Sequence, residues 1–162
     1  NKLSTFASLL LGEARKKKRE GLIDEAEALL KIANDLEYNI KTSFTLAEHF
    51  YLTGKAKKAN ELVNTSLENS DSKSWDLKLY ELALKTAIDI KNKDEAKIRY
   101  EAYKQINAIP NPVLDALYFN LTGDSDRAKE VISEVNALLL SKQYLKNKFS
   151  PKSINEINRL KQ

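Results

Sequence analysis

The sequence predicts an all-α chain, an α-solenoid of about four helical hairpins with a C-terminal capping helix. Two observations carry this prediction. A tight turn followed by a small residue recurs four times, and the alanines after these turns lie 33, 37 and 32 residues apart, at Ala26, Ala59, Ala96 and Ala128. Such a period is typical of stacked helical hairpins. Apolar residues also recur at three- and four-residue spacing, without the alternation of a half-buried strand.

The composition agrees with a single helix-rich domain over residues 1–162. Hydrophobic residues make up 42% of the chain and charged residues 31%, with four Gly and three Pro, which suits a folded helical protein. Cysteine is absent, which excludes disulfides, thiolate nucleophiles and Cys-ligated zinc. The longest apolar run near the start, Leu9 to Leu11, is far too short for a membrane span. Met is also absent, which fits an exported mature chain and a cytoplasmic excerpt equally, so the sequence leaves the localisation open.

The first two hairpins are expected to turn at glycines, because a missing side chain permits the left-handed conformation that ends a helix. Gly21 separates the first pair of helices and Gly54 the second. Asp24 and Glu25 fall in the first turn of their helix, where the positive end of the helix dipole favours acidic side chains. The predicted helices are 2–20, 22–36, 40–52 and 55–68.

The third hairpin lacks a glycine at its turn, where Lys91 is followed by Asn92, a residue that tolerates left-handed backbone. We still expect the turn to form. The longer spacing before this hairpin falls in a polar run, so we expect a less regular, bendable step near residues 70–75. The fourth hairpin is entered at Pro112, which suits a first helical turn. The predicted helices are 73–90, 94–107, 112–121 and 124–139.

The repeat fades from Leu140 onward. A helix over 143–149 and a last short helix are expected, with Ser153 and Glu156 spaced as a capping box. Residues 140–162 carry six Lys or Arg and one Glu, and a polar segment of this kind suits the cap of a helical stack. The predicted repeats are 5–38, 39–70, 73–108 and 112–140, followed by the cap at 141–162.

The turns and the alanines after them resemble those of tetratricopeptide repeat proteins, a family of helix-turn-helix units. In that family a small residue of the first helix meets a small residue of the second. Ala14, Ala47 and Ala116 match the first-helix position, whereas Leu84 departs from it. The resemblance covers about residues 5–140 and is degenerate in every copy. It implies a right-handed superhelix whose first helices line a concave groove for peptides or partner helices.

Carrying the groove face over by spacing from each alanine gives a mixed set of candidate residues. Apolar and aromatic members would take up a partner's side chains while charged members fix its register. Three of the apolar members suit a position in the core equally well. The candidates are Leu11, Arg15, Lys18, Lys41, Phe44, Glu48, Tyr51, Lys78, Glu81, Lys85, Val113, Leu117 and Asn120.

The sequence argues against catalysis and predicts neither a cofactor nor a metal. The chain has one histidine, His49, and no cysteine, whereas nucleophilic catalysis needs a base within reach of the nucleophile. The adjacent Glu48 and His49 point about 100° apart on a helix and form no dyad. Paired metal ligands and a glycine-rich phosphate loop are missing from the pattern.

We therefore predict a non-catalytic protein–protein interaction module, a scaffold or adaptor that binds a peptide or partner helix. The alternative is a regulatory receptor domain that responds to a ligand or peptide, as some bacterial tetratricopeptide-type receptors do. The net charge of +4 is below that of dedicated nucleic-acid binders. A clamp for a chaperone's C-terminal carboxylate is disfavoured because Glu48 and Glu81 interrupt the positive field. The oligomeric state and the partner's identity do not follow from the sequence.

Overall fold

The computed structural model describes residues 4–69, 76–106, 109 and 111–162.

The hairpins turn at four sites that share one hydrogen-bond pattern. One residue in each turn has a positive φ, namely 79° at Gly21, 85° at Gly54, 58° at Lys91 and 97° at Gly123. The residue that follows donates its N–H to the carbonyl five positions back, at 2.7 to 3.1 Å. This is the Schellman ending of a helix, so the turn without glycine forms in the same way as the others.

The four repeated alanines fix where the second helix of each hairpin begins and how closely it approaches the first. Each alanine N–H donates to the carbonyl of the residue just after the left-handed one, at 2.9 to 3.1 Å. All four are 0% exposed, and the residues at the matching first-helix position are at most 1% exposed. The first-helix position holds alanine in three hairpins and Leu84 in the third, whereas a side chain larger than alanine at the second-helix position would force the helices apart. Each repeated alanine therefore marks the first turn of the second helix and the point where the two helices of the hairpin pack closely.

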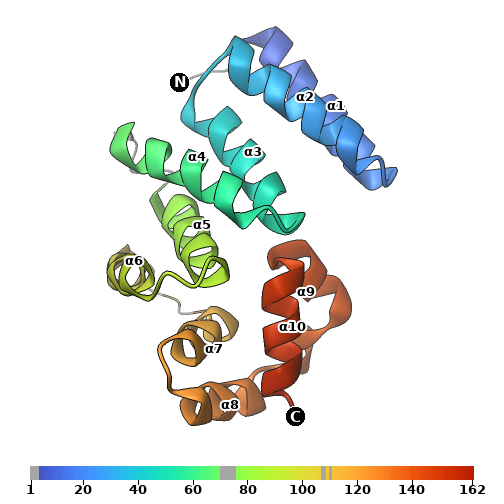
Figure 1. The fold of residues 1–162 in the computed structure, drawn as a ribbon. Coiled ribbons are helices and arrows are strands. Elements are labelled where there is room, and N and C mark those ends of the chain that lie inside the picture. Colours follow the sequence, from blue (N-terminus) through green and yellow to red (C-terminus); the bar gives the residue numbers. More distant parts are fainter. Residues whose placement is uncertain (1–3, 70–75, 107–108, 110) are drawn as a thin grey trace.

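The described residues form ten α-helices and one short 3₁₀ helix, and strands are absent from that part of the chain. Helices α1, α3, α5 and α7 each pack most extensively on the helix that follows, so four hairpins succeed one another along a stack (Figure 1). The bounds are α1 Thr5–Arg19, α2 Ile23–Leu36, α3 Ile40–Leu52, α4 Ala56–Asn69, α5 Asp76–Asp89, α6 Lys93–Ile106, α7 Pro112–Leu121, α8 Ser125–Glu134, η1 Ala137–Leu140, α9 Lys142–Lys148 and α10 Pro151–Leu160.

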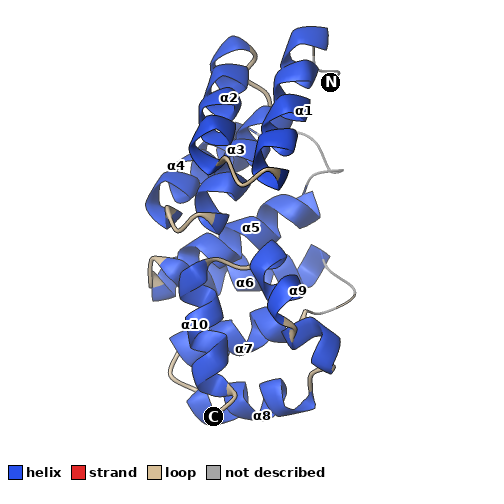
Figure 2. Ribbon diagram, turned by 90° about the vertical axis from the view of Figure 1, so that its right-hand side faces the viewer, coloured by secondary structure: helices blue, strands red, loops and turns tan. Residues whose placement is uncertain are grey.

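The C-terminal helices fold back along the stack. Helix α10 packs on α7 and α8, while α9 reaches as far as α3. Figures 1 and 2 show α9 and α10 lying along the side of the stack formed by the first helices of the hairpins. The segment that we predicted to cap the last hairpin contacts that hairpin and also extends past it toward the second.

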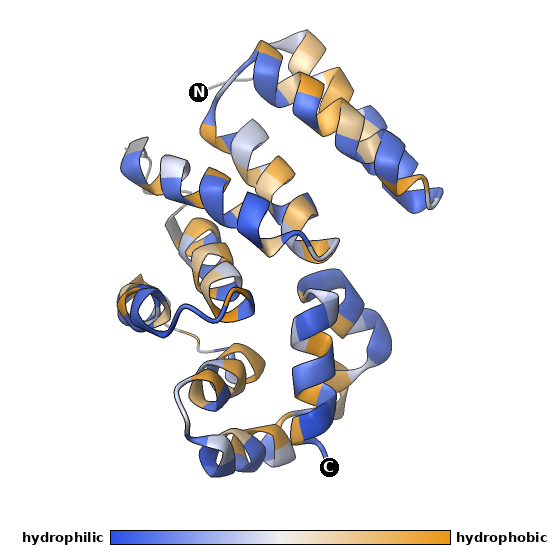
Figure 3. Ribbon diagram, viewed as in Figure 1, coloured by the Kyte–Doolittle hydropathy of each residue, from blue (hydrophilic) through white to orange (hydrophobic). Residues whose placement is uncertain are grey.

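Helix α5 contributes to two separate hydrophobic clusters. Its first half packs with the first two hairpins through Leu79, Leu82 and Ala83. Its second half packs with α6, α7, α8 and the C-terminal helices through Leu84, Ala87 and Ile88. Figure 3 shows hydrophobic and hydrophilic residues sharing each helix, as expected when one stripe of a helix faces a core. Within the described ranges, no helix is both long and apolar enough to cross a membrane.

Two predictions near the C-terminus are wrong in detail. The helix predicted over 124–139 ends at Glu134, because Asn136 accepts a hydrogen bond from the N–H of Leu138 at 2.9 Å and starts the 3₁₀ helix instead. Asn side chains compete with helical hydrogen bonding in this way. The predicted cap at Ser153 is also wrong, since Ser150 caps α10 and Pro151 occupies its first position. The step predicted near 70–75 lies outside the described residues.

The turn at Lys91 carries backbone strain that the three glycine turns avoid. A left-handed conformation costs a residue with a side chain about 1 to 2 kcal/mol. Replacing Lys91 with Gly removes this cost, but glycine also has more conformational freedom in the unfolded state, which offsets part of the stabilisation. We expect Lys91→Gly to raise the free energy of unfolding by about 0.5 to 1 kcal/mol. We expect Gly54→Ala to lower it by about 1 kcal/mol or more. Urea denaturation checks both, and equal stabilities of the three proteins would contradict this account.

Candidate functional site

Six of the candidate groove residues line one cavity between α3 and α5. The cavity has a volume of about 350 Å³ and is bounded on one side by the end of α9. We call it the α3–α5 pocket. Its lining residues are Phe44, Glu48, Tyr51 and Leu52 from α3, Lys78, Glu81, Leu82 and Lys85 from α5, and Asn147 and Lys148 from α9. The size is that of a small-molecule or side-chain pocket.

Within the α3–α5 pocket, the buried Lys85 connects α5 to the end of α9. Its ammonium group lies 3.1 Å from Glu81 Oε1 and donates to the carbonyl of Lys148 at 2.9 Å. It also lies 4.8 Å from the centre of the Phe149 ring, close enough for a cation–π contact. Because Lys85 is buried with these partners, it joins α5 to α9 and holds the pocket wall in place.

Charged side chains of both signs surround the mouth of the pocket. Glu48, Lys78 and Lys148 are exposed there. The candidate Lys18 of α1 does not line the pocket; burial lowers the pKa of its half-buried ammonium, and the field of Glu48 partly opposes this effect. The lining of the pocket therefore combines the apolar side chains of Phe44, Leu52 and Leu82 with charged groups of both signs.

The remaining candidates do not line this pocket. Leu11 lies in the core beside Ala14, and Val113 and Leu117 lie in the core that α10 covers. Arg15 and Lys41 are exposed on α1 and α3, whereas Asn120 donates from its side chain to Glu156 at 3.1 Å. The α7 part of the predicted groove is thus occupied by the protein's own C-terminal helix.

Helix α10 is attached to the first helices by a buried polar cluster that sequence reasoning missed. Asp89, only 4% exposed, accepts hydrogen bonds from the hydroxyls of Ser150 and Ser153, the latter at 2.6 Å. The ammonium of Lys152 donates to the Asp89 carbonyl at 2.8 Å. Burial raises the pKa of Asp89, while the two serine hydrogen bonds act to lower it.

A signal for this cluster was present in the sequence. Asp89 is the last residue of α5, where the negative end of the helix dipole disfavours an acidic side chain. Its carboxylate lies instead at the positive N-terminus of α10, next to the capping residue Ser150. An acidic residue at the wrong end of a helix therefore indicates a partner elsewhere.

His49 of α3 faces helix α2 of the preceding hairpin. It is 1% exposed, and its Nε2 lies 3.5 Å from Glu27 Oε1, which also pairs with Lys55 at 2.8 Å. Burial lowers the pKa of His49 to about 4. Among the described residues, no group of three or more His, Asp or Glu side chains is placed to hold a metal ion.

The buried His49 should make the fold sensitive to acid. The unfolded chain takes up the proton near the ordinary pKa of 6.5, but the folded imidazole resists it until about pH 4. Between these values the unfolded state binds more protons, so the free energy of unfolding falls as the pH drops, by at most about 1.4 kcal/mol per pH unit. Thermal unfolding at pH 7, 6, 5 and 4 should show a flatter profile for His49→Gln. Parallel profiles would contradict the assignment.

Comparison of the chain with protein-family models, curated proteins and solved structures found no match in any of the three. The tetratricopeptide resemblance therefore stays a prediction from the turns and alanines.

Proposed function

We propose that the protein is a non-catalytic interaction module of tetratricopeptide-like architecture that binds a peptide segment or partner helix in the α3–α5 pocket. The observation that carries the proposal is the gathering of six candidate groove residues from two successive first helices around one cavity of about 350 Å³. Interfaces place the side-chain anchors of a partner in pockets, next to polar and charged groups that set the orientation of the partner.

The architecture is supported by the repeated turn. Four Schellman endings, each followed by a fully buried alanine, place four hairpins in succession. Units of this kind bury their apolar faces on their neighbours. A right-handed superhelix would place α1, α3, α5 and α7 on the inner face, the side on which α9 and α10 lie (Figure 2).

The charges near the pocket favour an acidic partner segment. Lys85 pairs with Glu81, and the lining of the pocket also includes Glu48, Lys78 and Lys148. The exposed Arg15 of α1 and Lys41 of α3 add positive charge on the same helices or next to them. We therefore propose a segment with one bulky apolar residue for the pocket, flanked by Asp or Glu that meet the basic side chains.

Selection from a random peptide library displayed on phage tests this function. Peptides with an apolar residue beside acidic ones should be enriched. Lys78→Glu should weaken their binding by about tenfold, because it replaces an attraction between Lys78 and an acidic peptide residue by a repulsion. Lys57→Glu, an exposed change on α4, is the matched control and should leave binding unchanged. Equal losses in the two variants, or no enriched sequence, would overturn the proposal.

A further inference from the structure

The strained Lys91 lies at the edge of a second cavity. This cavity, which we call the turn pocket, has a volume of about 310 Å³ and lies between the α5–α6 turn, α7 and α10. Ile88, Leu117 and Leu121 supply its apolar lining, and four cationic side chains, Lys91, Lys93, Lys152 and Arg159, line it as well. The three other turns have glycine where this one has lysine. Strained residues of this kind cluster at functional sites.

The acidic side chains of the turn pocket already have partners. Asp89 accepts from Ser150 and Ser153. Glu156 pairs with Arg159 at 2.6 Å and accepts from Asn120 at 3.1 Å. Neither carboxylate lies within ion-pair distance of Lys91 or Lys93.

Two lysine ammonium groups of the turn pocket form no ion pair with its acidic lining residues. Within the described part of the chain, neither Lys91 nor Lys93 forms a side-chain hydrogen bond or an ion pair, and both are exposed at the pocket. Lys93 is also the first residue of α6, whose first turn contains Asp94 and Glu95, so these two acidic residues offset the positive end of the helix dipole. An anionic group between the two lysines would gain from both ammonium groups.

We propose that the turn pocket binds a small amphiphilic anion. Its apolar body would pack on Ile88, Leu117 and Leu121, and its carboxylate or phosphate would lie between Lys91 and Lys93. A cavity of about 310 Å³ with an apolar lining and a few charged groups has the anatomy of a small-ligand site. This site is separate from the α3–α5 pocket, since the two share no lining residue.

The experiment is a titration of the ¹⁵N-labelled chain with octanoate and with octyl phosphate, followed by amide chemical shifts. Either anion should shift residues 88–93, 117–121 and 152–159, and the tighter of the two identifies the preferred anionic group. Octylammonium, which has the same apolar body and the opposite charge, should leave these amides in place. Equal shifts with octylammonium, or no shift with either anion, would overturn the proposal.

Variants separate the role of the lysines from folding. Lys91→Gly should weaken binding of the preferred anion by about fivefold while raising the melting temperature, because it removes a charge contact and relieves the left-handed strain. Lys93→Gln should weaken it similarly. Lys97→Gln, one helical turn further along α6 and outside the pocket, is the matched control. Undiminished affinity in Lys91→Gly and Lys93→Gln would refute the site even if both proteins fold.

Discussion

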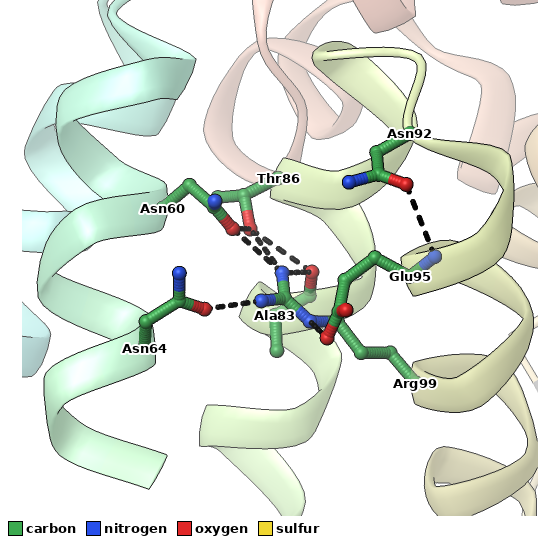
Figure 4. A network of polar contacts seen from close by, with 7 residues as sticks. All are labelled: Asn60, Asn64, Ala83, Thr86, Asn92, Glu95 and Arg99. Atoms are coloured by element: carbon green, nitrogen blue, oxygen red, sulfur yellow. Dashed lines mark hydrogen bonds and ion pairs between the residues drawn. The ribbon is translucent and has the colours of Figure 1, made fainter. Parts of the chain in front are cut away.

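Replacing Arg99 with Ala is expected to lower the free energy of unfolding by about 2 to 4 kcal/mol, because buried groups of α5 lose a charged hydrogen-bond donor. Arg99 is 3% exposed and joins three helices (Figure 4). Its guanidinium donates to Asn60 of α4 at 2.7 Å, to the Ala83 carbonyl of α5 at 2.8 Å and to Glu95 of its own helix at 3.1 Å. A further bond goes to Asn64. Alanine would leave the carbonyl of the buried Ala83 without this charged donor, whereas Asn60 and Glu95 are half-buried and Asn64 is exposed to water.

Two control variants test the prediction for Arg99→Ala. Arg99→Lys keeps the charge but loses the planar guanidinium group that reaches several acceptors at once. Its free energy of unfolding should therefore lie between those of wild type and Arg99→Ala. Arg19→Ala, an exposed change at the end of α1, should stay within about 0.5 kcal/mol of wild type. Urea denaturation measures all three. An Arg99→Ala protein as stable as Arg19→Ala would show that the network does not hold the second and third hairpins together.

Asp89→Ala is expected to cost about 2 to 4 kcal/mol and to loosen the C-terminal helices first. The change leaves the hydroxyls of Ser150 and Ser153, both at most 1% exposed, without their acceptor. Because these bonds connect α5 to α10, amide exchange should speed up in α9 and α10 more than in the first two hairpins. Asp35→Ala, an exposed change on α2, is the control and should alter neither quantity.

A double-variant comparison assigns the Asp89 effect to its serine contact. Ser153 donates to Asp89 Oδ1 at 2.6 Å, so removing both groups should cost less than the sum of the single losses, by about 1 kcal/mol or more. Strict additivity would mean that Asp89 acts through other neighbours. Uniform exchange across the whole chain in Asp89→Ala would mean that α9 and α10 do not open separately.

The four hairpins could be predicted from the sequence because their signals are local. A left-handed turn residue and an alanine five positions later specify where one helix ends and how closely the next approaches it, and both act within a few residues. The third turn shows the limit of such reasoning. Asn92 tolerates left-handed backbone better than lysine does, yet Lys91 takes that conformation, and the Asn92 side chain accepts from the N–H of Glu95 at 3.2 Å and caps α6.

The position of the C-terminal helices could not be predicted because it depends on contacts between distant parts of the chain. Asp89 and Ser153 are separated by 64 positions, and Lys85 and Lys148 by 63. Contacts between residues so far apart leave no periodic pattern in the sequence from which they could be predicted. The same contacts explain the uneven placement of the candidate groove residues. Those of α3 and α5 line a pocket, whereas α10 covers the α7 end, where Leu117 is buried.

The most direct test of the proposed function is to map where a selected peptide binds. Chemical shifts of the ¹⁵N-labelled chain, recorded as a peptide from the display selection is added, locate the contact. We predict shifts concentrated in residues 44–52, 78–85 and 147–148, the lining of the α3–α5 pocket, and their loss in Lys78→Glu. Shifts centred on another surface, or shifts unchanged by Lys78→Glu, would contradict the assignment of this pocket as the binding site.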